Sequence, residues 1–443
     1  MKKRVFTLVA CLVVSGLVLT ACGPKPAEAP ALTAVPTEAS TTILAADPTE
    51  EPTEEPTQEP TEESVVTLTI WADDTRAPIL SRIGQEFTAQ YGVNVVVEMQ
   101  SELGDIRDQL RTAGPAGEGP DIIVGPNDWL GQLVSNGLLA SIDLDLSGKK
   151  DQFLEAALQA FTAEGKLYGM PYATENVAFV RNTDFVPEAP ETWDEVREIA
   201  AQLEGEGKVQ QGYVIQSGPG DTYHFFPILT AFGGSIFGLD AEGNYNPDDV
   251  RLDSAGSLAA AEWLDTMVKE GHLQASVDWD TMHAMFGNRQ AAMFITGPWS
   301  LSQIKESGVP YAISNLPAGP AGAGQPFLGV QAFMVSAFSH DIVLAQTFLT
   351  EFVATKEVIL ELYQDGQRPP AFLPALEEVT DPDMVAFGEA GRNGIPMPSF
   401  AAMSNVWSAC NDALTLISNQ QAQPVETFTN AATQVRTAMT VGQ

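Results

Sequence analysis

Two carboxylates and two tryptophans in this 443-residue chain have the types and positions expected of a carbohydrate site. Asp128 and Glu175 each lie at or just past the end of a predicted strand, Trp299 follows a Gly-Pro turn, and Trp407 begins a predicted helical run. Carboxylates accept hydrogen bonds from vicinal sugar hydroxyls, and an indole packs on the C–H face of a sugar ring. The four residues therefore predict a sugar-binding cleft.

The elements that must position these residues alternate between strands and amphipathic helices. The first predicted elements are strands 65–71, 93–97 and 121–124, with helices 78–91 and 103–112 between them. Beyond residue 171 the predicted elements are strand 177–180, a helix opening at Thr192, a hairpin over 240–249 and a helix over 254–270. This alternation predicts an α/β fold with mostly parallel sheets flanked by helices, in which ligands bind at the carboxyl ends of the strands.

The length of the folded part favours two lobes. Roughly 380 residues follow position 64, whereas single hydrophobic cores stop growing near ~250 to 300 residues. We expect an N-lobe formed by residues 65–173 with 331–374 and a C-lobe formed by 175–325 with 383–443. The crossovers would fall near Thr174, at 327–330 and at about 375–383, with the ligand cleft between the lobes and a hinge that closes them.

The N-terminus has the pattern of an export signal. Lys2, Lys3 and Arg4 precede an apolar run that ends in Leu-Thr-Ala-Cys at Cys22. This ending resembles the lipobox of bacterial lipoproteins, which implies that residues 1–21 are removed and that Cys22 carries a lipid anchoring the chain outside the cytoplasm. An uncleaved membrane helix is the alternative, but the apolar run is only marginally long enough to span a bilayer.

Residues 22–64 predict a disordered stalk, because their Pro-Thr-Glu-Glu repeats cannot bury a core. Cys11 would be lost with the signal and Cys22 lipidated, so Cys410 is left without a disulfide partner.

The whole chain has 22 basic and 58 acidic residues, a formal charge of -36. Such a charge repels phosphate backbones, so nucleic acid is not an expected partner.

From about Leu68 to its end the chain resembles the extracellular solute-binding proteins of ABC sugar importers, and among them the maltose/maltodextrin-binding proteins. The resemblance is carried by residues 119–123 (Gly-Pro-Asp-Ile-Ile), 127–128 (Asn-Asp), 171–175 (Pro-Tyr-Ala-Thr-Glu), 297–299 (Gly-Pro-Trp), 326–330 (Pro-Phe-Leu-Gly-Val) and 397–407 (Met-Pro-Ser-Phe-Ala-Ala-Met-Ser-Asn-Val-Trp). It implies a two-lobed periplasmic-binding-protein fold. It also implies a monomeric receptor that delivers maltodextrin-type sugars to a membrane permease.

The resemblance also implies further sugar contacts. These fall on Asp221, Tyr223 and the early charged pair, for which Asp74 and Arg76 are the expected members. The chain departs from the family pattern where Gly125 replaces a tryptophan, and Trp129, which follows the acid at Asp128, would supply the missing stacking face. After Trp407 the usual Tyr and Arg are replaced by Ser408 and Asn411, and Asn411 is counted among the expected contacts. These departures leave the exact sugar open.

The remaining alternatives are another oligosaccharide or a sugar alcohol as the ligand, a chemoreceptor as a partner, and a glycoside hydrolase. Two carboxylates flanking a glycosidic bond would suit hydrolysis, but the same acids serve equally as hydroxyl acceptors without proton transfer. His224, His272, His283 and His340 are scattered singly, and no calcium-binding loop pattern occurs. We therefore expect a binding protein that is not an enzyme and holds no cofactor or metal.

Trp71, Trp193 and Trp263 are expected in the core.

Overall fold

The computed structural model describes residues 66–101, 103–240 and 244–441. The chain divides into two units, Met1–Glu62 and Glu63–Gln443, and all the described residues belong to the second unit. The predicted signal peptide, the lipidated Cys22 and the stalk lie outside the described residues, as does the tip of the predicted hairpin at 241–243.

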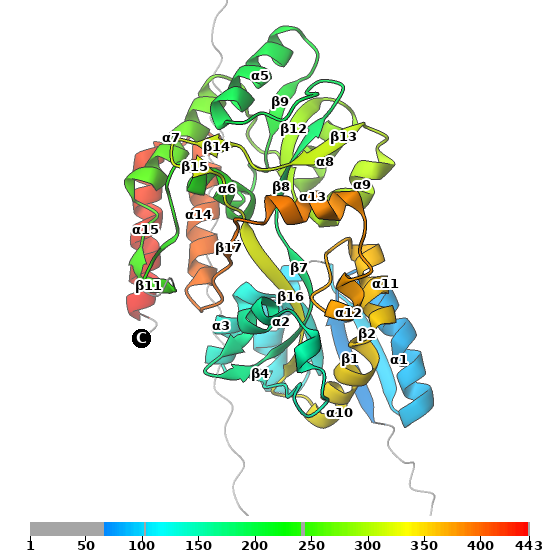
Figure 1. Ribbon diagram of the computed structural model, residues 1–443. Helices are drawn as coiled ribbons and strands as arrows, with labels where there is room; N and C mark the ends of the chain where they lie inside the picture. The colour runs from blue at the N-terminus through cyan, green and yellow to red at the C-terminus, as the bar shows by residue number, and fades with distance from the viewer. Residues whose placement is uncertain (1–65, 102, 241–243, 442–443) are drawn as a thin grey trace, which may run out of the picture. The chain divides into compact units, whose positions relative to one another are not determined.

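The first sheet has seven strands and is built around a parallel trio, in the order β3-β1-β2. The long strand β16 runs antiparallel to β3 and also pairs with β4, β7 and β17. The strands are β1 (Thr67–Ala72), β2 (Asn94–Met99), β3 (Ile122–Pro126), β4 (Leu139–Ala140), β7 (Gly169–Glu175), β16 (Phe327–Ser336) and β17 (Ile395–Pro396). Figure 1 shows β16 running beside β7.

Helices and short turns surround this sheet. They are α1 (Ala77–Tyr91), α2 (Leu103–Ala116), η1 (Asn127–Trp129), α3 (Leu130–Ser135), η2 (Lys150–Gln152), α4 (Glu155–Ala160), α10 (Ile342–Thr347), η4 (Phe348–Val353), α11 (Lys356–Gly366) and α12 (Leu373–Leu376), with a small hairpin of β5 (Thr162–Ala163) and β6 (Lys166–Leu167). In α1 the buried residues Ile79, Leu80, Ile83 and Phe87 recur at helical spacing. The helix ends at Gly92, whose φ of 69° is the left-handed conformation that glycine adopts readily.

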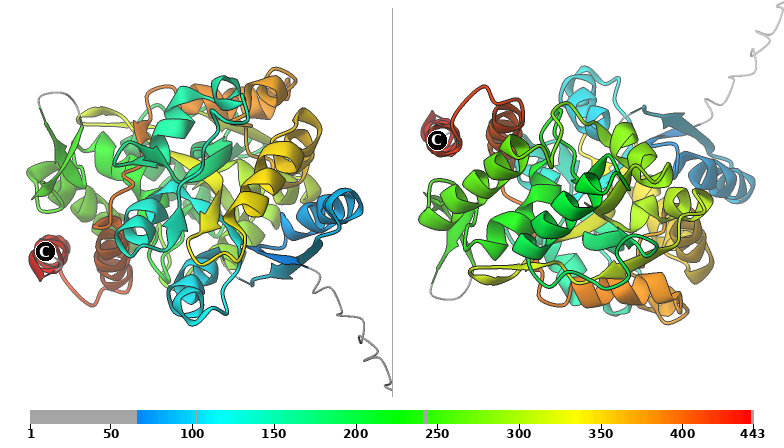
Figure 2. Two further views of the ribbon diagram at one scale, coloured as in Figure 1. Left: turned by 90° about the horizontal axis from the view of Figure 1, so that it is seen from below. Right: turned by 90° about the horizontal axis from the view of Figure 1, so that it is seen from above.

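The second sheet has four strands in the order β13-β8-β12-β9. Its strands are β8 (Ala178–Asn182), β9 (Gln211–Val214), β12 (Ala291–Thr296) and β13 (Tyr311–Ser314), and two further hairpins are β10 (Phe237–Leu239) with β11 (Tyr245–Val250) and β14 (Ala318–Gly319) with β15 (Gly322–Ala323). The accompanying helices are α5 (Trp193–Gly205), α6 (Thr222–Ala231), α7 (Ala255–Lys269), α8 (Trp279–Gly287), η3 (Pro298–Ser300), α9 (Leu301–Glu306), α13 (Pro382–Ala390), α14 (Met403–Ser418) and α15 (Pro424–Val441). The two views of Figure 2 place α14 beside α15.

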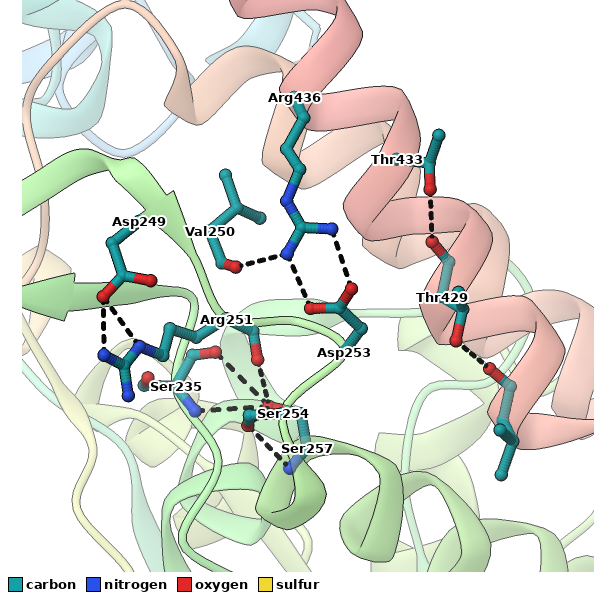
Figure 3. Close-up of polar contacts among 11 residues, drawn as sticks. Ser235, Asp249, Val250, Arg251, Asp253, Ser254, Ser257, Thr429, Thr433 and Arg436 are labelled. Atoms are coloured by element: carbon teal, nitrogen blue, oxygen red, sulfur yellow. Dashed lines mark hydrogen bonds and ion pairs between the residues drawn. The ribbon is translucent and has the colours of Figure 1, made fainter.

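The last helix, α15, is bound to two elements that lie much earlier in the sequence, the hairpin strand β11 and the start of α7. Arg436 of α15 donates to both carboxylate oxygens of Asp253, at 2.7 Å each, and to the carbonyl oxygen of Val250 at 2.7 Å (Figure 3). Ser254 caps α7 by accepting from the backbone N–H of Ser257. A bidentate arginine contact fixes orientation as well as distance, so α15 is held in one register against α7.

Two main hydrophobic cores lie under the two sheets. The first takes buried residues from 68–173 and 330–375, and the second takes them from 177–316, 327 and 397–435. The chain therefore passes between the cores three times, between Ala173 and Val177, between Phe327 and Val330, and between Ala375 and Met397. Trp71, Trp193 and Trp263 are all buried, as predicted.

The two-lobed α/β fold is confirmed, but the expectation that each sheet is mostly parallel is wrong. In the first sheet β16 runs antiparallel to β3, β4 and β7, so only the trio β3-β1-β2 and the short β17 pair in parallel. In the second sheet β12 pairs with β9 in parallel, while β8 runs antiparallel to both β12 and β13. The reason is the path of the chain. Strands β12 and β13 are joined through α9 and run the same way, but β8 lies between them and enters directly from β7, so it runs in the opposite direction.

Candidate ligand-binding site

Asp128 and Trp407 meet between the two cores. Asp128 lies in η1, directly after β3, and Trp407 lies one turn inside α14. The indole Nε1 donates to Asp128 Oδ2 over 2.8 Å. Burial raises the pKa of Asp128 to about 6, against the Trp407 hydrogen bond and the charge of Arg107, which lower it. A partly buried carboxylate is thus held at the end of a parallel strand, where the fold presents ligands.

Glu175 is the second carboxylate, at the end of β7. Its Oε1 accepts from Gln331 Nε2 at 3.0 Å, and its Oε2 accepts from Arg368 Nε at 2.5 Å. The Glu175 side chain is 8% exposed and that of Arg368 15% exposed. Gln331 comes from β16, the strand paired with β7, so the sheet itself sets the position of the amide. Burial is the largest cause of the raised pKa of Asp128. The negative charge of Glu175 is close enough to raise this pKa slightly further.

Trp299 lies in η3, immediately after β12. A side chain at Gly297 would overlap its ring, because a Cβ there would lie 2.2 Å from two ring atoms, so glycine is needed for the indole to fold over the turn. The guanidinium carbon of Arg368 lies 5.3 Å from the centroid of the Trp299 ring. Trp299 therefore shares one arginine with Glu175.

Tyr223 and Phe327 complete an aromatic group with Trp299 and Trp407. The Tyr223 ring lies 6.1 Å from both Trp299 and Phe327, and Phe327 lies 6.0 Å from Trp407, measured between centroids. The Tyr223 hydroxyl is buried and has no hydrogen-bond partner among the described residues, and the same holds for Gln331 Oε1. Both atoms are available to a polar ligand, since buried polar groups are normally paired.

The space beside the Tyr223 hydroxyl depends on Gly329 of β16. A Cβ built there would lie 3.1 Å from Glu175 Cγ and 3.4 Å from both Glu175 Oε1 and the Tyr223 hydroxyl oxygen. Glycine at this position therefore keeps the gap between the carboxylate and the hydroxyl open.

The early charged pair is Arg76 with Asp73, whereas Asp74 is exposed. Arg76 is 1% exposed, ion-pairs with Asp73 and donates from Nε to the Tyr172 hydroxyl. Asp74 accepts a 3.4 Å contact from the neighbouring Thr75 hydroxyl. Buried Arg76 Nη2 has no hydrogen-bond partner among the residues that the structure describes. Asp73, and not the expected Asp74, is therefore the acid paired with Arg76.

Asp221 and Asn411 have structural partners. Asp221 caps α6, accepting from the backbone N–H of Tyr223 at 2.9 Å and of His224 at 3.2 Å, and it contacts His224 Nδ1 at 2.7 Å. Asn411 Oδ1 accepts from the Thr222 backbone N–H and hydroxyl, joining α14 to the start of α6. Their described contacts position α6, which carries Tyr223.

Trp129 is 5% exposed and belongs to the first core. Its ring covers Gly125, where a Cβ would lie 2.1 Å from the indole. Trp129 thus fills the space of a side chain at Gly125, while Arg107 lies over its ring at 5.9 Å. Trp129 therefore anchors η1, the turn that carries Asp128, in the first core.

Arg368, Gln331 and Asp73 were not identified from the sequence. Arg368 reaches Glu175 because the Thr174 backbone N–H donates to the Pro369 carbonyl at 2.8 Å, which lays the segment after α11 along β7. Thr174 and Pro369 are 195 positions apart in the sequence, so no local sequence pattern predicts their pairing. The one local feature that could have indicated it is the run Arg-Pro-Pro at 368–370, which favours extended backbone.

Within the described part of the chain, no group of three or more His, Cys, Asp or Glu side chains could hold a metal ion. No helix in those same residues is long and apolar enough to cross a membrane.

Comparison with known proteins agrees with this architecture. The chain is 28% identical over 381 residues to a galactooligosaccharide-binding protein of Bacillus subtilis, covering 82% of this chain and 87% of the relative. It is 27% identical over 349 residues to a maltotriose-binding protein of Pyrococcus abyssi, covering 76% and 73%. It is 25% identical over 381 residues to a maltooligosaccharide ABC transporter solute-binding lipoprotein of Streptococcus pneumoniae, covering 80% and 88%.

A family model described as bacterial extracellular solute-binding protein matches residues 82–386. This match includes all four strands of the second sheet, the first sheet apart from β1 and β17, and both Asp128 and Glu175. The chain therefore belongs to the bacterial extracellular solute-binding proteins.

Proposed function

We propose that this protein is the sugar-binding receptor of an ABC importer, which captures maltose or maltodextrin-type oligosaccharides and delivers them to a membrane permease. One observation supports the proposal most strongly: carboxylates and indoles from both lobes lie close together, beside the buried Tyr223 hydroxyl, which has no hydrogen-bond partner in the described part of the chain. Hydroxyl acceptors and aromatic faces are what a neutral oligosaccharide requires. The proposed ligand contacts are Arg76, Asp128, Glu175, Tyr223, Trp299 and Trp407.

The lobes of this receptor are the two chain regions that supply the two cores, 65–173 with 331–374 and 175–325 with 383–443. The crossovers near Thr174, at 327–330 and at about 375–383 act as the hinge. Sugar stabilises the closed arrangement because it contacts both lobes at once. Export and lipidation of Cys22 anchor the monomer to the membrane, and the residues between Cys22 and the folded unit give it reach.

A galacto-oligosaccharide is the second candidate ligand, favoured by the similarity to the Bacillus subtilis galactooligosaccharide-binding protein. Glucose and galactose units differ in the orientation of one hydroxyl, and malto- and galacto-oligosaccharides also differ in their linkages. The carboxylates and indoles of this site do not by themselves distinguish these features.

Hydrolysis is not part of the proposal. Glu175 has both oxygens engaged, one by Gln331 and one by Arg368, so it is arranged as a fixed acceptor. Beside a proton-donating acid such as Asp128, a hydrolase would need a second carboxylate free to act as nucleophile or as base toward water, and the engaged Glu175 does not offer one.

Titration calorimetry against maltose, maltotriose, a galacto-oligosaccharide, trehalose, a cyclodextrin and xylo-oligosaccharides tests the proposal. We expect heat with a malto- or galacto-oligosaccharide and no release of reducing sugar on long incubation. The absence of binding heat with every malto- and galacto-oligosaccharide would refute the ligand assignment. Steady formation of product would refute the receptor assignment and favour an enzyme.

A further inference from the structure

We propose that Arg368 occupies the place of the sugar in the ligand-free protein and thereby determines affinity and selectivity at Trp299. The inference rests on the proposed function, since it concerns the same site. The guanidinium lies over the Trp299 ring at 5.3 Å and donates to Glu175 Oε2 at 2.5 Å. One side chain thus engages both an indole face and a carboxylate, the two kinds of group that a sugar ring would use.

The physical reason for this overlap is that a guanidinium and a sugar ring present similar groups. A guanidinium is flat, stacks on the electron-rich face of an indole and donates N–H groups to a carboxylate from its edge. A sugar ring places its C–H face on the same indole and donates O–H groups to the same carboxylate. A sugar that occupied this same face of Trp299 and this same oxygen of Glu175 would displace the guanidinium.

The backbone around Arg368 is fixed, so exchange involves its side chain. The following residues are tied to β7 by the hydrogen bond from Thr174 to Pro369 and by a bridge between Ala173 and Pro370. Those residues pack with the first core, whereas Trp299 packs against the second. The stacking contact therefore also joins the two lobes without a ligand.

A displaced guanidinium has another acidic partner within electrostatic reach. Burial lowers the pKa of Arg368, but Glu175, Tyr172 and Asp73 together raise it, so the group stays charged. Asp73 is itself paired with Arg76, but its negative charge still favours a guanidinium nearby when sugar takes Glu175. A ligand that engages only Trp299 or only Glu175 does not replace both contacts of Arg368, and this makes the exchange selective.

The expected size of the effect follows from competition. Apparent affinity is reduced by the fraction of molecules that are competent to bind, so an arginine that fills the site in about nine of ten molecules weakens sugar binding about tenfold. The test uses residues 22–443 with Cys22→Ser, so that no lipid is attached. Its variants are Arg368→Gln, Arg368→Lys and the control Arg82→Gln, which removes an equal charge at a surface pair with Glu86 and Glu361.

Calorimetry with whichever of maltotriose and a galacto-oligosaccharide binds the parent protein gives the first readout. We expect Arg368→Gln to bind about tenfold more tightly. Arg368→Lys, which keeps a charge for Glu175 but loses the planar face, should gain less, and Arg82→Gln should match the parent. An unchanged or weaker affinity in folded Arg368→Gln, or in Arg368→Lys where the glutamine variant does not fold, overturns the proposal.

Acrylamide quenching of tryptophan fluorescence without ligand gives a second readout. Removal of the guanidinium should increase quenching in Arg368→Gln or Arg368→Lys relative to the parent, and the increase should vanish in a Trp299→Phe background. Equal quenching in both backgrounds overturns the Arg368 proposal whether or not sugar binds. Failure of the parent to bind any sugar in the panel refutes the proposed function separately.

Discussion

Replacement of Trp407 by phenylalanine isolates the hydrogen bond that joins α14 to Asp128. The change keeps most of the aromatic surface against Phe327, 6.0 Å away between centroids, but removes the Nε1–H that donates to Asp128 Oδ2 over 2.8 Å. A hydrogen bond to a charged group contributes about 1.5 to 3 kcal/mol, so we expect the ligand-free protein to lose about that much stability.

The same substitution should change the titration of Asp128. Burial already raises its pKa to about 6, and the Trp407 hydrogen bond opposes this by favouring the charged form. Without the donor the carboxylate is harder to ionise, so we expect its pKa to rise further. Urea unfolding measures the stability, and carboxyl-carbon NMR as a function of pH measures the pKa.

Trp71→Phe provides the matched control. Trp71 Nε1 donates to Glu98 Oε2 over 2.7 Å, a bond of the same kind between adjacent strands. It should lower stability but leave both the Asp128 titration and sugar affinity unchanged. An Asp128 pKa that stays near its parent value in Trp407→Phe would show that the indole is not its donor in solution and would refute this reasoning.

Three further predictions concern pH, Asp221 and Cys410. Because the folded-state pKa of Asp128 is raised, its ionised acceptor is present above about pH 6 and is lost as the pH falls through 6. We therefore expect sugar affinity to drop by about fivefold between pH 7 and 5, as a charge-assisted hydrogen bond becomes neutral. Calorimetry on Asp128→Asn should show weak affinity with most of this pH dependence removed, and an unaltered dependence would assign it to another group. Asp221→Ala should cost about 0.5 to 2 kcal/mol of stability by removing the α6 cap, whereas Asp221→Asn should retain the cap, as thermal unfolding would show; equal melting temperatures for the two variants would contradict the capping role. Burial raises the pKa of the Cys410 thiol to about 12, so a thiol reagent should modify it only after unfolding; rapid labelling of the native protein would contradict its burial.

The sequence predicted the elements with strong local patterns. Helix α1 begins within one residue of its expected start and ends at Tyr91, before Gly92, because apolar spacing and a left-handed glycine are both local features. Thr192 was placed at the start of α5 for a similar reason, and its side chain accepts from the Glu195 backbone N–H. The placement of Asp128 and Glu175 near strand ends came from the same patterns.

Contacts between distant segments could not be predicted in this way. The antiparallel entry of β8 depends on which strands it pairs with, and the position of Arg368 depends on the pairing of residues 369–370 with β7. Asp73 and Asp74 are adjacent, and only the turn before α1 decides which one faces Arg76. The roles of Asp221 and Asn411 were likewise indistinguishable from ligand contacts, because a capping oxygen and a sugar acceptor have the same chemistry.

A crystal structure of the protein with bound maltotriose, or with the galacto-oligosaccharide if that is the sugar that binds, tests the central claim most directly. We expect a sugar between the lobes, with a hydroxyl donating to Asp128 or Glu175 and a ring face on Trp299 or Trp407. We also expect the Arg368 guanidinium to leave the Trp299 face. Sugar density confined to one lobe and away from these four residues would refute the proposed binding site.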